Sequence, residues 1–194
     1  MAVQPVRILA FAGSARRESF NVRLATAAAA AARAAGAEVT LLDMREYAMP
    51  LFDQDLEAES GMPERAAAFK QQLVDHAGWL IACPEYNSAI TPLLKNAIDW
   101  ASRKTGDEPP LAAFRGKTCA LLSASPGALG GLRGLGGVRS ILSSIGVLVL
   151  PDQLAVPAAH EAFDVEGRLI DARRQQALEG VAGALVEVTR RLHG

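Results

Sequence analysis

The chain alternates between short, continuous apolar runs and longer segments in which apolar residues recur at helical spacing. Runs of this kind, bounded by turn residues, are typical of buried strands. The strands are predicted at residues 6–12, 38–43, 78–83, 117–123 and 147–150. The helices are predicted at residues 21–35, 63–76, 91–102, 130–145 and 171–192. Strand and helix therefore take turns along the whole sequence.

Local signals support several of these boundaries. Gly36 follows the first helical segment, as a glycine at a helix C-terminus does. Pro63 lies in the first turn of the second predicted helix, where its missing N–H costs nothing. Asp171 is a cap for the last predicted helix. Residues 44–62 have no clear period and are predicted to form a surface connection, and residues 151–169 are predicted to be irregular.

Strands that alternate with helices predict a parallel sheet covered by helices on both faces. Because crossover connections are right-handed, few topologies remain, and the order 2-1-3-4-5 is one of the two common doubly wound solutions. We expect one domain over residues 1–194, of the α/β class. Ligands in such folds bind beyond the carboxyl ends of the strands, so the loops at residues 13–21, 84–91 and 123–131 are expected to converge.

Composition narrows the class of protein. Half of the 194 residues are apolar, the formal net charge is −1, and no basic stripe is visible, which argues against a nucleic-acid partner. Cys83 and Cys119 lie in apolar runs without CxxC spacing or nearby histidines, so we expect buried free thiols and no metal site. No apolar run is long enough for a membrane span or a signal peptide, and we expect a cytoplasmic protein.

The loop after the first strand reads GSARRESFN, at residues 13–21. A polar loop that leaves a strand and opens a helix favours an anion, because the first N–H groups of the helix lack partners. Here the loop adds two hydroxyls, a side-chain amide, and the guanidinium groups of Arg16 and Arg17, whose planar forks suit a phosphate. A solvated turn with an ordinary helix cap is the alternative.

The other two loops carry groups suited to a flat heterocycle. Residues 84–88 read PEYNS, an aromatic side chain among hydrogen-bonding groups, although proline and asparagine are also common in plain turns. Residues 123–127 read SASPG, and such small residues allow a close approach of the backbone to a ring. One loop for a phosphate and two for a ring predict a site for a mononucleotide-sized cofactor.

A dinucleotide in a Rossmann site is the natural rival. Asp43 ends the second strand, where an acid that binds ribose would lie. However, the first strand is followed by the single Gly13, so the G-x-G-x-x-G fingerprint is missing, and the Walker A pattern is missing too. Asp43 is therefore interpreted as a strand-end or loop-capping acid.

Four segments carry a family resemblance: GSARRESFN, PEYN at residues 84–87, LKNAIDW at residues 94–100 and the glycine-rich loop after the fourth strand. In these segments the chain resembles the NAD(P)H-dependent FMN reductases, a family that includes quinone, chromate and azo-dye reductases. The resemblance covers about residues 6–150. It implies a flavodoxin-like fold, a non-covalent FMN, a nicotinamide cofactor as electron donor, and a homodimer or homotetramer.

The resemblance also implies a set of cofactor-binding residues. The FMN phosphate is expected to be held by Ser14, Arg16, Ser19 and Asn21. The isoalloxazine is expected to be lined by Pro84, Glu85, Tyr86 and Asn87, with the pocket completed by Ser123, Ser125 and Gly127. The nicotinamide cofactor has no motif of its own; Arg133 and Arg139 are candidates for its phosphates, and a solvated helix face is the simpler alternative.

The expected activity is a two-electron transfer from NAD(P)H to FMN and onward to a small acceptor such as a quinone, or chromate, azo or nitro compounds. The cofactor carries that chemistry, so no catalytic side chain is assigned. Glu85 is a possible general base, with a loop-shaping role preferred. Ser14 has no GxSxG elbow, which leaves a hydrolase triad unsupported. A non-enzymatic FMN-binding electron carrier or sensing module is the alternative, although carriers of that type are generally more acidic than this chain.

Overall fold

The computed structural model describes residues 5–194; residues 1–4 of the expected domain lie outside the described part. One parallel sheet forms the middle layer. Its strands are β1 (Arg7–Ala12), β2 (Glu38–Leu42), β3 (Gly78–Ala82), β6 (Thr118–Ala124) and β7 (Leu148–Val156). They are arranged β2-β1-β3-β6-β7, which confirms the predicted doubly wound order.

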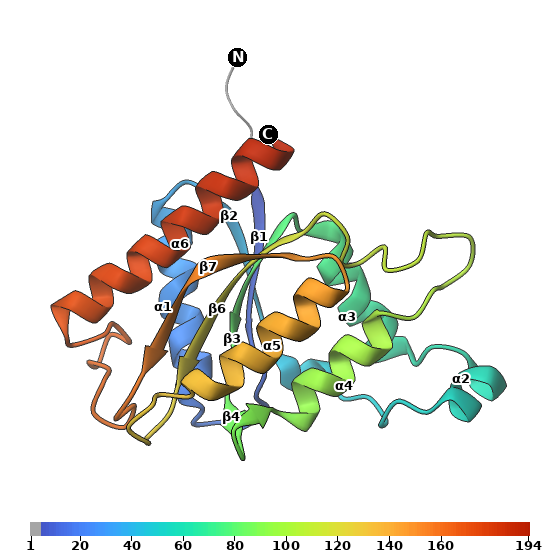
Figure 1. Cartoon of the computed structure of the whole chain (residues 1–194), viewed down its shortest axis with the longest axis horizontal. Coiled ribbons are helices and arrows are strands. Elements are labelled where there is room, and N and C mark those ends of the chain that lie inside the picture. The colour runs from blue at the N-terminus through green and yellow to red at the C-terminus, as the bar shows by residue number, and fades with distance from the viewer. Residues whose placement is uncertain (1–4) are drawn as a thin grey trace.

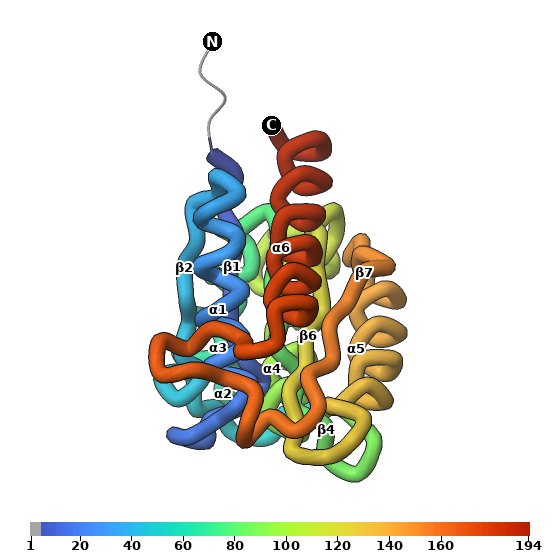
Figure 2. The backbone as a smooth tube through the Cα atoms, turned by 90° about the vertical axis from the view of Figure 1, so that its left-hand side faces the viewer, coloured from blue at the N-terminus to red at the C-terminus, as the bar shows by residue number. Residues whose placement is uncertain are grey.

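Helices cover both faces of this sheet (Figure 1). One face carries α1 (Phe20–Ala34) and α6 (Ala172–His193). The other carries α3 (Glu64–Asp75), α4 (Pro92–Ala101) and α5 (Leu132–Ser144). In Figure 2, the C-terminal end of α6 lies at the opposite end of the molecule from β4 (Glu85–Tyr86).

Alternation along the central strands divides the core into two halves. Successive side chains of a strand point to opposite faces. Ile8 and Ala10 accordingly pack under α1 and α6, whereas Leu9 and Phe11 pack under the helices of the other face. Every residue of β3 and β6 is buried, because parallel strands inside a doubly wound sheet have no solvent face.

Small residues let the helices of the first face approach the sheet closely. The buried stripe of α1 consists mainly of alanines, among them Ala25, Ala28 and Ala29. Gly78, at the start of β3, has no room for a side chain, since a Cβ there would lie 2.6 Å from Thr118 Oγ1 and 2.7 Å from Thr189 Oγ1. The Thr118 and Thr189 hydroxyls themselves are 2.6 Å apart and join β6 to α6.

The connection at residues 44–62 is more regular than predicted. It contains a 3₁₀ helix, η1 (Met44–Tyr47), and a short helix, α2 (Gln54–Ser60). Asp43 caps η1 by accepting a 2.9 Å hydrogen bond from the Arg45 N–H, which confirms its interpretation as a capping acid. Helix α2 buries none of its residues, so it leaves no hydrophobic periodicity for a sequence pattern to detect.

The fifth strand is longer than predicted. It continues through Pro151 to Val156, so the expectation that residues 151–169 are irregular is wrong for its first six residues. A bulge makes this possible: the register with β6 shifts between Cys119 and Leu121, where proline needs no ladder partner. Arg139 of α5 stabilises the bulge by donating to the Leu150 carbonyl at 2.6 Å and the Gln153 side-chain oxygen at 2.9 Å.

Candidate functional site

The three predicted loops meet at the carboxyl ends of the central strands. The loops follow β1, β3 and β6, which are neighbours in the sheet. They enclose one cavity of about 280 Å³. Its lining consists of Ser14, Arg16, Ser19, Phe20, Asn21, Pro84, Glu85, Tyr86, Ala124, Ser125 and Pro126.

The first loop presents hydrogen-bond donors to this cavity at the N-terminus of α1. Ser19 caps the helix by accepting a 3.4 Å bond from the Val22 N–H, and Ser14 Oγ accepts a 3.3 Å bond from the Arg16 N–H. Each hydroxyl thus uses an acceptor and keeps its own O–H, because neither donates a hydrogen bond within residues 5–194. Both serines are buried. Two free hydroxyl donors in the lining of the cavity, one of them at the positive end of a helix, favour an anion.

Arg16 adds a positive charge at the mouth of the cavity. Its guanidinium carbon lies 5.2 Å from the centre of the Phe20 ring, which is a cation–π contact. Among the ion pairs of residues 5–194, none includes Arg16. The side chain is therefore oriented by an aromatic face and its charge is not neutralised by a carboxylate.

Asn21 ties the first loop to the third. Its amide donates to the Ala124 carbonyl at 2.8 Å and accepts from the Ala124 N–H at 2.9 Å. Both residues are buried, so these bonds satisfy two backbone groups that water does not reach. Asn21 lines the cavity, but the structure shows its polar atoms holding the loops together.

A second tie joins the first loop to α4. The Thr91 hydroxyl donates to the Gly13 carbonyl at 2.8 Å and caps α4 by accepting from the Leu94 N–H at 3.3 Å. A Cβ on Gly13 would lie 2.9 Å from the Leu94 Cβ, so the loop reaches this position only as glycine. The cavity is thus built by loops that are fixed to one another before any ligand enters.

The second loop forms a small hairpin that the sequence did not predict. Strand β4 pairs with β5 (Ala89–Ile90), and the turn between them is Asn87–Ser88. Both turn residues have positive φ, 51° and 66°, as a two-residue type I′ turn requires. Strands of two residues are too short for a hydrophobic period, and Asn-Ser is a weaker hairpin signal than Asn-Gly.

Glu85 turns its carboxylate away from solvent, toward the start of α5. Oε1 accepts from Arg133 Nη2 at 2.8 Å and from its Nε at 3.1 Å, while Oε2 accepts from the Gly134 N–H at 2.9 Å. Burial raises the pKa of Glu85, but the hydrogen bonds from Gly134 and Arg133 outweigh it and hold the pKa below its ordinary value. An ionised, fully partnered carboxylate favours a loop-shaping role over a general base.

The structure separates the predicted cofactor residues into two groups. Those that line the cavity are Ser14, Arg16, Ser19, Asn21, Pro84, Glu85, Tyr86 and Ser125. Those that do not line it are Asn87, Ser123 and Gly127. Asn87 lies in the hairpin turn, and the buried Ser123 donates to the Gly130 carbonyl at 2.7 Å, which shapes the third loop.

The prediction omitted three lining residues: Phe20, Ala124 and Pro126. All three are next in sequence to a predicted residue, so their position in the loops was the available signal. Both candidates for nicotinamide phosphates form hydrogen bonds within the chain. Arg133 bonds to Glu85, and Arg139 bonds to β7. The alternative of a purely solvated helix face is wrong for Arg139, whose guanidinium bonds the backbone of β7.

A larger cavity, about 610 Å³, lies along α1, between that helix and residues 166–179. Alanines of α1 form much of its wall, and the loops of the predicted site do not reach it. Within residues 5–194 no helix is both long and apolar enough to cross a membrane. In the same part of the chain, no three histidine, cysteine or acidic side chains gather as a metal site would need.

Comparison with known proteins identifies the family of the chain. The family model for NADPH-dependent FMN reductases matches residues 6–161. The chain belongs to the NADPH-dependent FMN reductase family. The family resemblance expected from the sequence is thereby confirmed.

Individual relatives extend over the full chain. An NAD(P)H-dependent FMN reductase of Pseudomonas aeruginosa is 34% identical over 190 residues, covering 97% of this chain and 98% of the relative. An NADPH:quinone oxidoreductase of Arabidopsis thaliana is 33% identical, covering 100% and 97%. Among solved structures, the flavoenzyme NAD(P)H:(acceptor) oxidoreductase FerB of Paracoccus denitrificans superimposes with a TM-score of 0.82 at 26% identity, covering 96% and 98%.

The residues of this FMN reductase family member fit FMN, the cofactor of the family. The hydroxyls of Ser14 and Ser19 and the guanidinium of Arg16 supply the donors that a phosphate accepts. Pro84, Tyr86 and Ala124 add apolar surface for a ring to the lining of the same cavity. The lining thus contains the two kinds of group that a flavin mononucleotide needs, donors for its phosphate and apolar surface for its ring.

Proposed function

We propose that this protein is an NAD(P)H-dependent FMN reductase that passes two electrons from the nicotinamide cofactor, through bound FMN, to a small acceptor of the quinone class. The observation that carries the proposal is the pair of hydroxyl donors without an acceptor in residues 5–194, Ser14 and the helix cap Ser19, in the same cavity as Pro84 and Tyr86. Family membership over residues 6–161 supports it.

In this proposal Ser14, Ser19 and Arg16 bind the phosphate, with Asn21 orienting the loop that carries them. Pro84, Tyr86 and Ser125 line the isoalloxazine. When bound, FMN supplies the two-electron chemistry that the side chains lack, by accepting a hydride and returning electrons to an acceptor. The chain contributes binding, orientation and the electrostatic surroundings, so no side chain is assigned as acid or base.

The acceptor is proposed from the names of relatives, one of which is an NADPH:quinone oxidoreductase. Tyr86, 56% exposed at the hairpin, is a flat surface on which an aromatic acceptor can stack beside the cofactor site. We also propose that residues 1–194 act as one domain in the cytoplasm and that the protein assembles as a homodimer or homotetramer.

Steady-state oxidation of NADPH by the FMN-loaded protein tests the function, with a benzoquinone as acceptor and the protein-free mixture as blank. We expect turnover that saturates in both substrates, with parallel double-reciprocal lines. Stoichiometric FMN without turnover on quinones, chromate, azo or nitro compounds would contradict the proposal and favour the non-enzymatic sensing module. Electron exchange with a protein partner alone would favour a carrier.

A further inference from the structure

The β4–β5 hairpin carries Tyr86 into the cavity but has little structure of its own. Each of its strands has two residues, and it is not part of the main sheet. Ser88 holds a φ of 66°, which the type I′ turn requires and which is uncommon for a residue other than glycine. A two-stranded ribbon of this size is not stable by itself in water. Something outside the hairpin must hold it in place.

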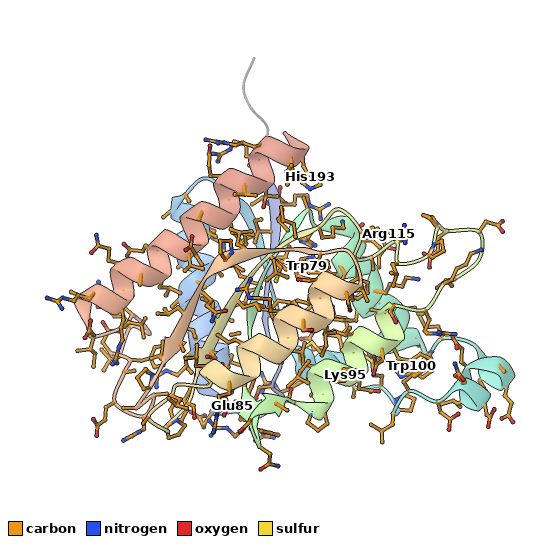
Figure 3. All side chains as sticks on the ribbon, viewed as in Figure 1. Trp79, Glu85, Lys95, Trp100, Arg115 and His193 are labelled. Atoms are coloured by element: carbon orange, nitrogen blue, oxygen red, sulfur yellow. The ribbon has the colours of Figure 1, made fainter. Side chains whose placement is uncertain are left out.

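The contacts of Glu85 supply that support. In Figure 3, Glu85, the first residue of β4, lies beside the first turn of α5. Its carboxylate is bonded three times to α5, twice by Arg133 and once by the Gly134 N–H. The Gly134 N–H belongs to the first turn of α5, where backbone N–H groups have no intrahelical partner. This end of the helix also favours a negative charge.

The packing around these bonds is close. A Cβ on Gly134 would lie 3.3 Å from the Glu85 Cβ and 3.4 Å from the Ala89 carbonyl oxygen, so the helix approaches both strands of the hairpin. The Glu85 side chain is 8% exposed, whereas Arg133 is 58% exposed. The carboxylate is therefore the buried anchor, and the guanidinium covers it from the solvent side.

We propose that Glu85, together with Arg133 and the first turn of α5, is a positioning device that fixes the Tyr86 hairpin against the cavity and thereby sets the affinity for the flavin ring. Glu85 acts through the hairpin and not as a contact to the phosphate or as an acid or base. The proposal deepens the proposed function and rests on it, because the ligand it names is the ring of the same cofactor.

Comparing riboflavin with FMN tests it, since riboflavin has the ring and lacks the phosphate. We expect Glu85→Ala to weaken binding of both ligands by about the same factor, near tenfold, as measured by quenching of flavin fluorescence. Arg133→Ala is the second variant, chosen because its exposed side chain can be removed without opening the core; we expect a smaller loss of the same kind. In the Glu85→Ala background, Arg133→Ala is expected to have no further effect.

Glu57→Gln is the matched control. Glu57 accepts two hydrogen bonds from Arg103 Nε, at 2.8 and 2.9 Å, and lines no part of the cavity. Removing this ion pair is expected to leave both flavin affinities unchanged. If Glu57→Gln lowers them as much as Glu85→Ala does, the effect is a general loss of stability and the positioning role is refuted.

Hydrogen–deuterium exchange of the apoprotein gives a reading that needs no flavin. We expect faster exchange at residues 85–90 in both Glu85→Ala and Arg133→Ala. Faster exchange with unchanged riboflavin affinity would overturn the inference, as would a raised KM for NADPH in Arg133→Ala with flavin affinity intact, which would make Arg133 a nicotinamide contact. Wild-type protein that binds neither flavin would instead overturn the proposed function, and this inference with it.

Discussion

Removing the Asn21 side-chain amide is expected to weaken both the fold and the cofactor site. In Asn21→Ala the Ala124 N–H and the Ala124 carbonyl lose their partners at 2.9 and 2.8 Å. Each unsatisfied buried backbone group costs about 1–3 kcal/mol. The sum is about 2–6 kcal/mol, and water entering from the cavity brings the expected loss in the free energy of unfolding toward the lower end.

Urea denaturation of the apoprotein measures this loss, and fluorescence titration with FMN measures its effect on the site. Asn21→Asp is a useful companion variant, because a carboxylate accepts from the Ala124 N–H but does not donate to the Ala124 carbonyl. It also places a negative charge beside the phosphate position, so we expect it to bind FMN less tightly than Asn21→Ala does, in spite of the bond that it retains.

Asn96 provides the matched control. Its side-chain amide likewise forms two hydrogen bonds with the backbone, accepting from the Phe52 N–H at 2.7 Å and donating to the Pro50 carbonyl at 2.9 Å. Asn96 does not line the cavity. Asn96→Ala is expected to destabilise the protein without changing FMN affinity. If the free energy of unfolding of Asn21→Ala lies within about 0.5 kcal/mol of that of the parent, the unpaired Ala124 groups do not carry the expected cost and the prediction is refuted.

Three further predictions concern single side chains. Arg16→Ala is expected to weaken FMN binding by about 1–3 kcal/mol in titration and to leave riboflavin binding unchanged. Equal losses of affinity for both ligands would show that Arg16 does not bind the phosphate. Tyr86→Ala is expected to lower flavin affinity with an unchanged urea midpoint, since Tyr86 is 56% exposed; a lowered midpoint would make it a structural residue. Burial holds the pKa of His76 below its ordinary value of 6.5, so the unfolded chain binds its proton first as the pH falls. Stability is therefore expected to decline as the pH drops through about 6.5, and His76→Gln to show a shallower decline in urea midpoints; an unchanged slope would assign the effect to other groups.

The fold was predictable because the central strands are buried on both faces. Strands β1, β3 and β6 appear in the sequence as apolar runs, and the rules of crossover connections then leave few strand orders. The elements that pattern alone missed bury little or depend on distant partners. Helix α2 has no buried face, and β7 passes Pro151 only because a bulge against β6 and the side chain of Arg139 permit it.

The candidate site was predictable to the level of its loops and not to the level of its internal bonds. The motifs at residues 13–21 and 84–87 placed most of the lining because those segments are local, although Asn87 does not line the cavity. Asn21 and Ala124 are 103 positions apart, and Glu85 and Arg133 are 48 apart. No spacing rule connects such distant pairs. The sequence alone therefore does not distinguish a side chain that hydrogen-bonds another loop from one that binds a ligand. Which residues touch FMN remains a prediction.

In the proposed function, electrons from a nicotinamide cofactor enter a flavin held at the loop of residues 13–21. The most direct test is anaerobic mixing of the FMN-loaded protein with NADPH while the visible absorbance of the flavin is followed, then addition of a benzoquinone. We predict that the flavin band bleaches on mixing and returns when the quinone is added. Arg16→Ala protein is expected to show a smaller response at FMN concentrations that just saturate the parent. Bound flavin whose band is unchanged by NADPH and by NADH would contradict the account.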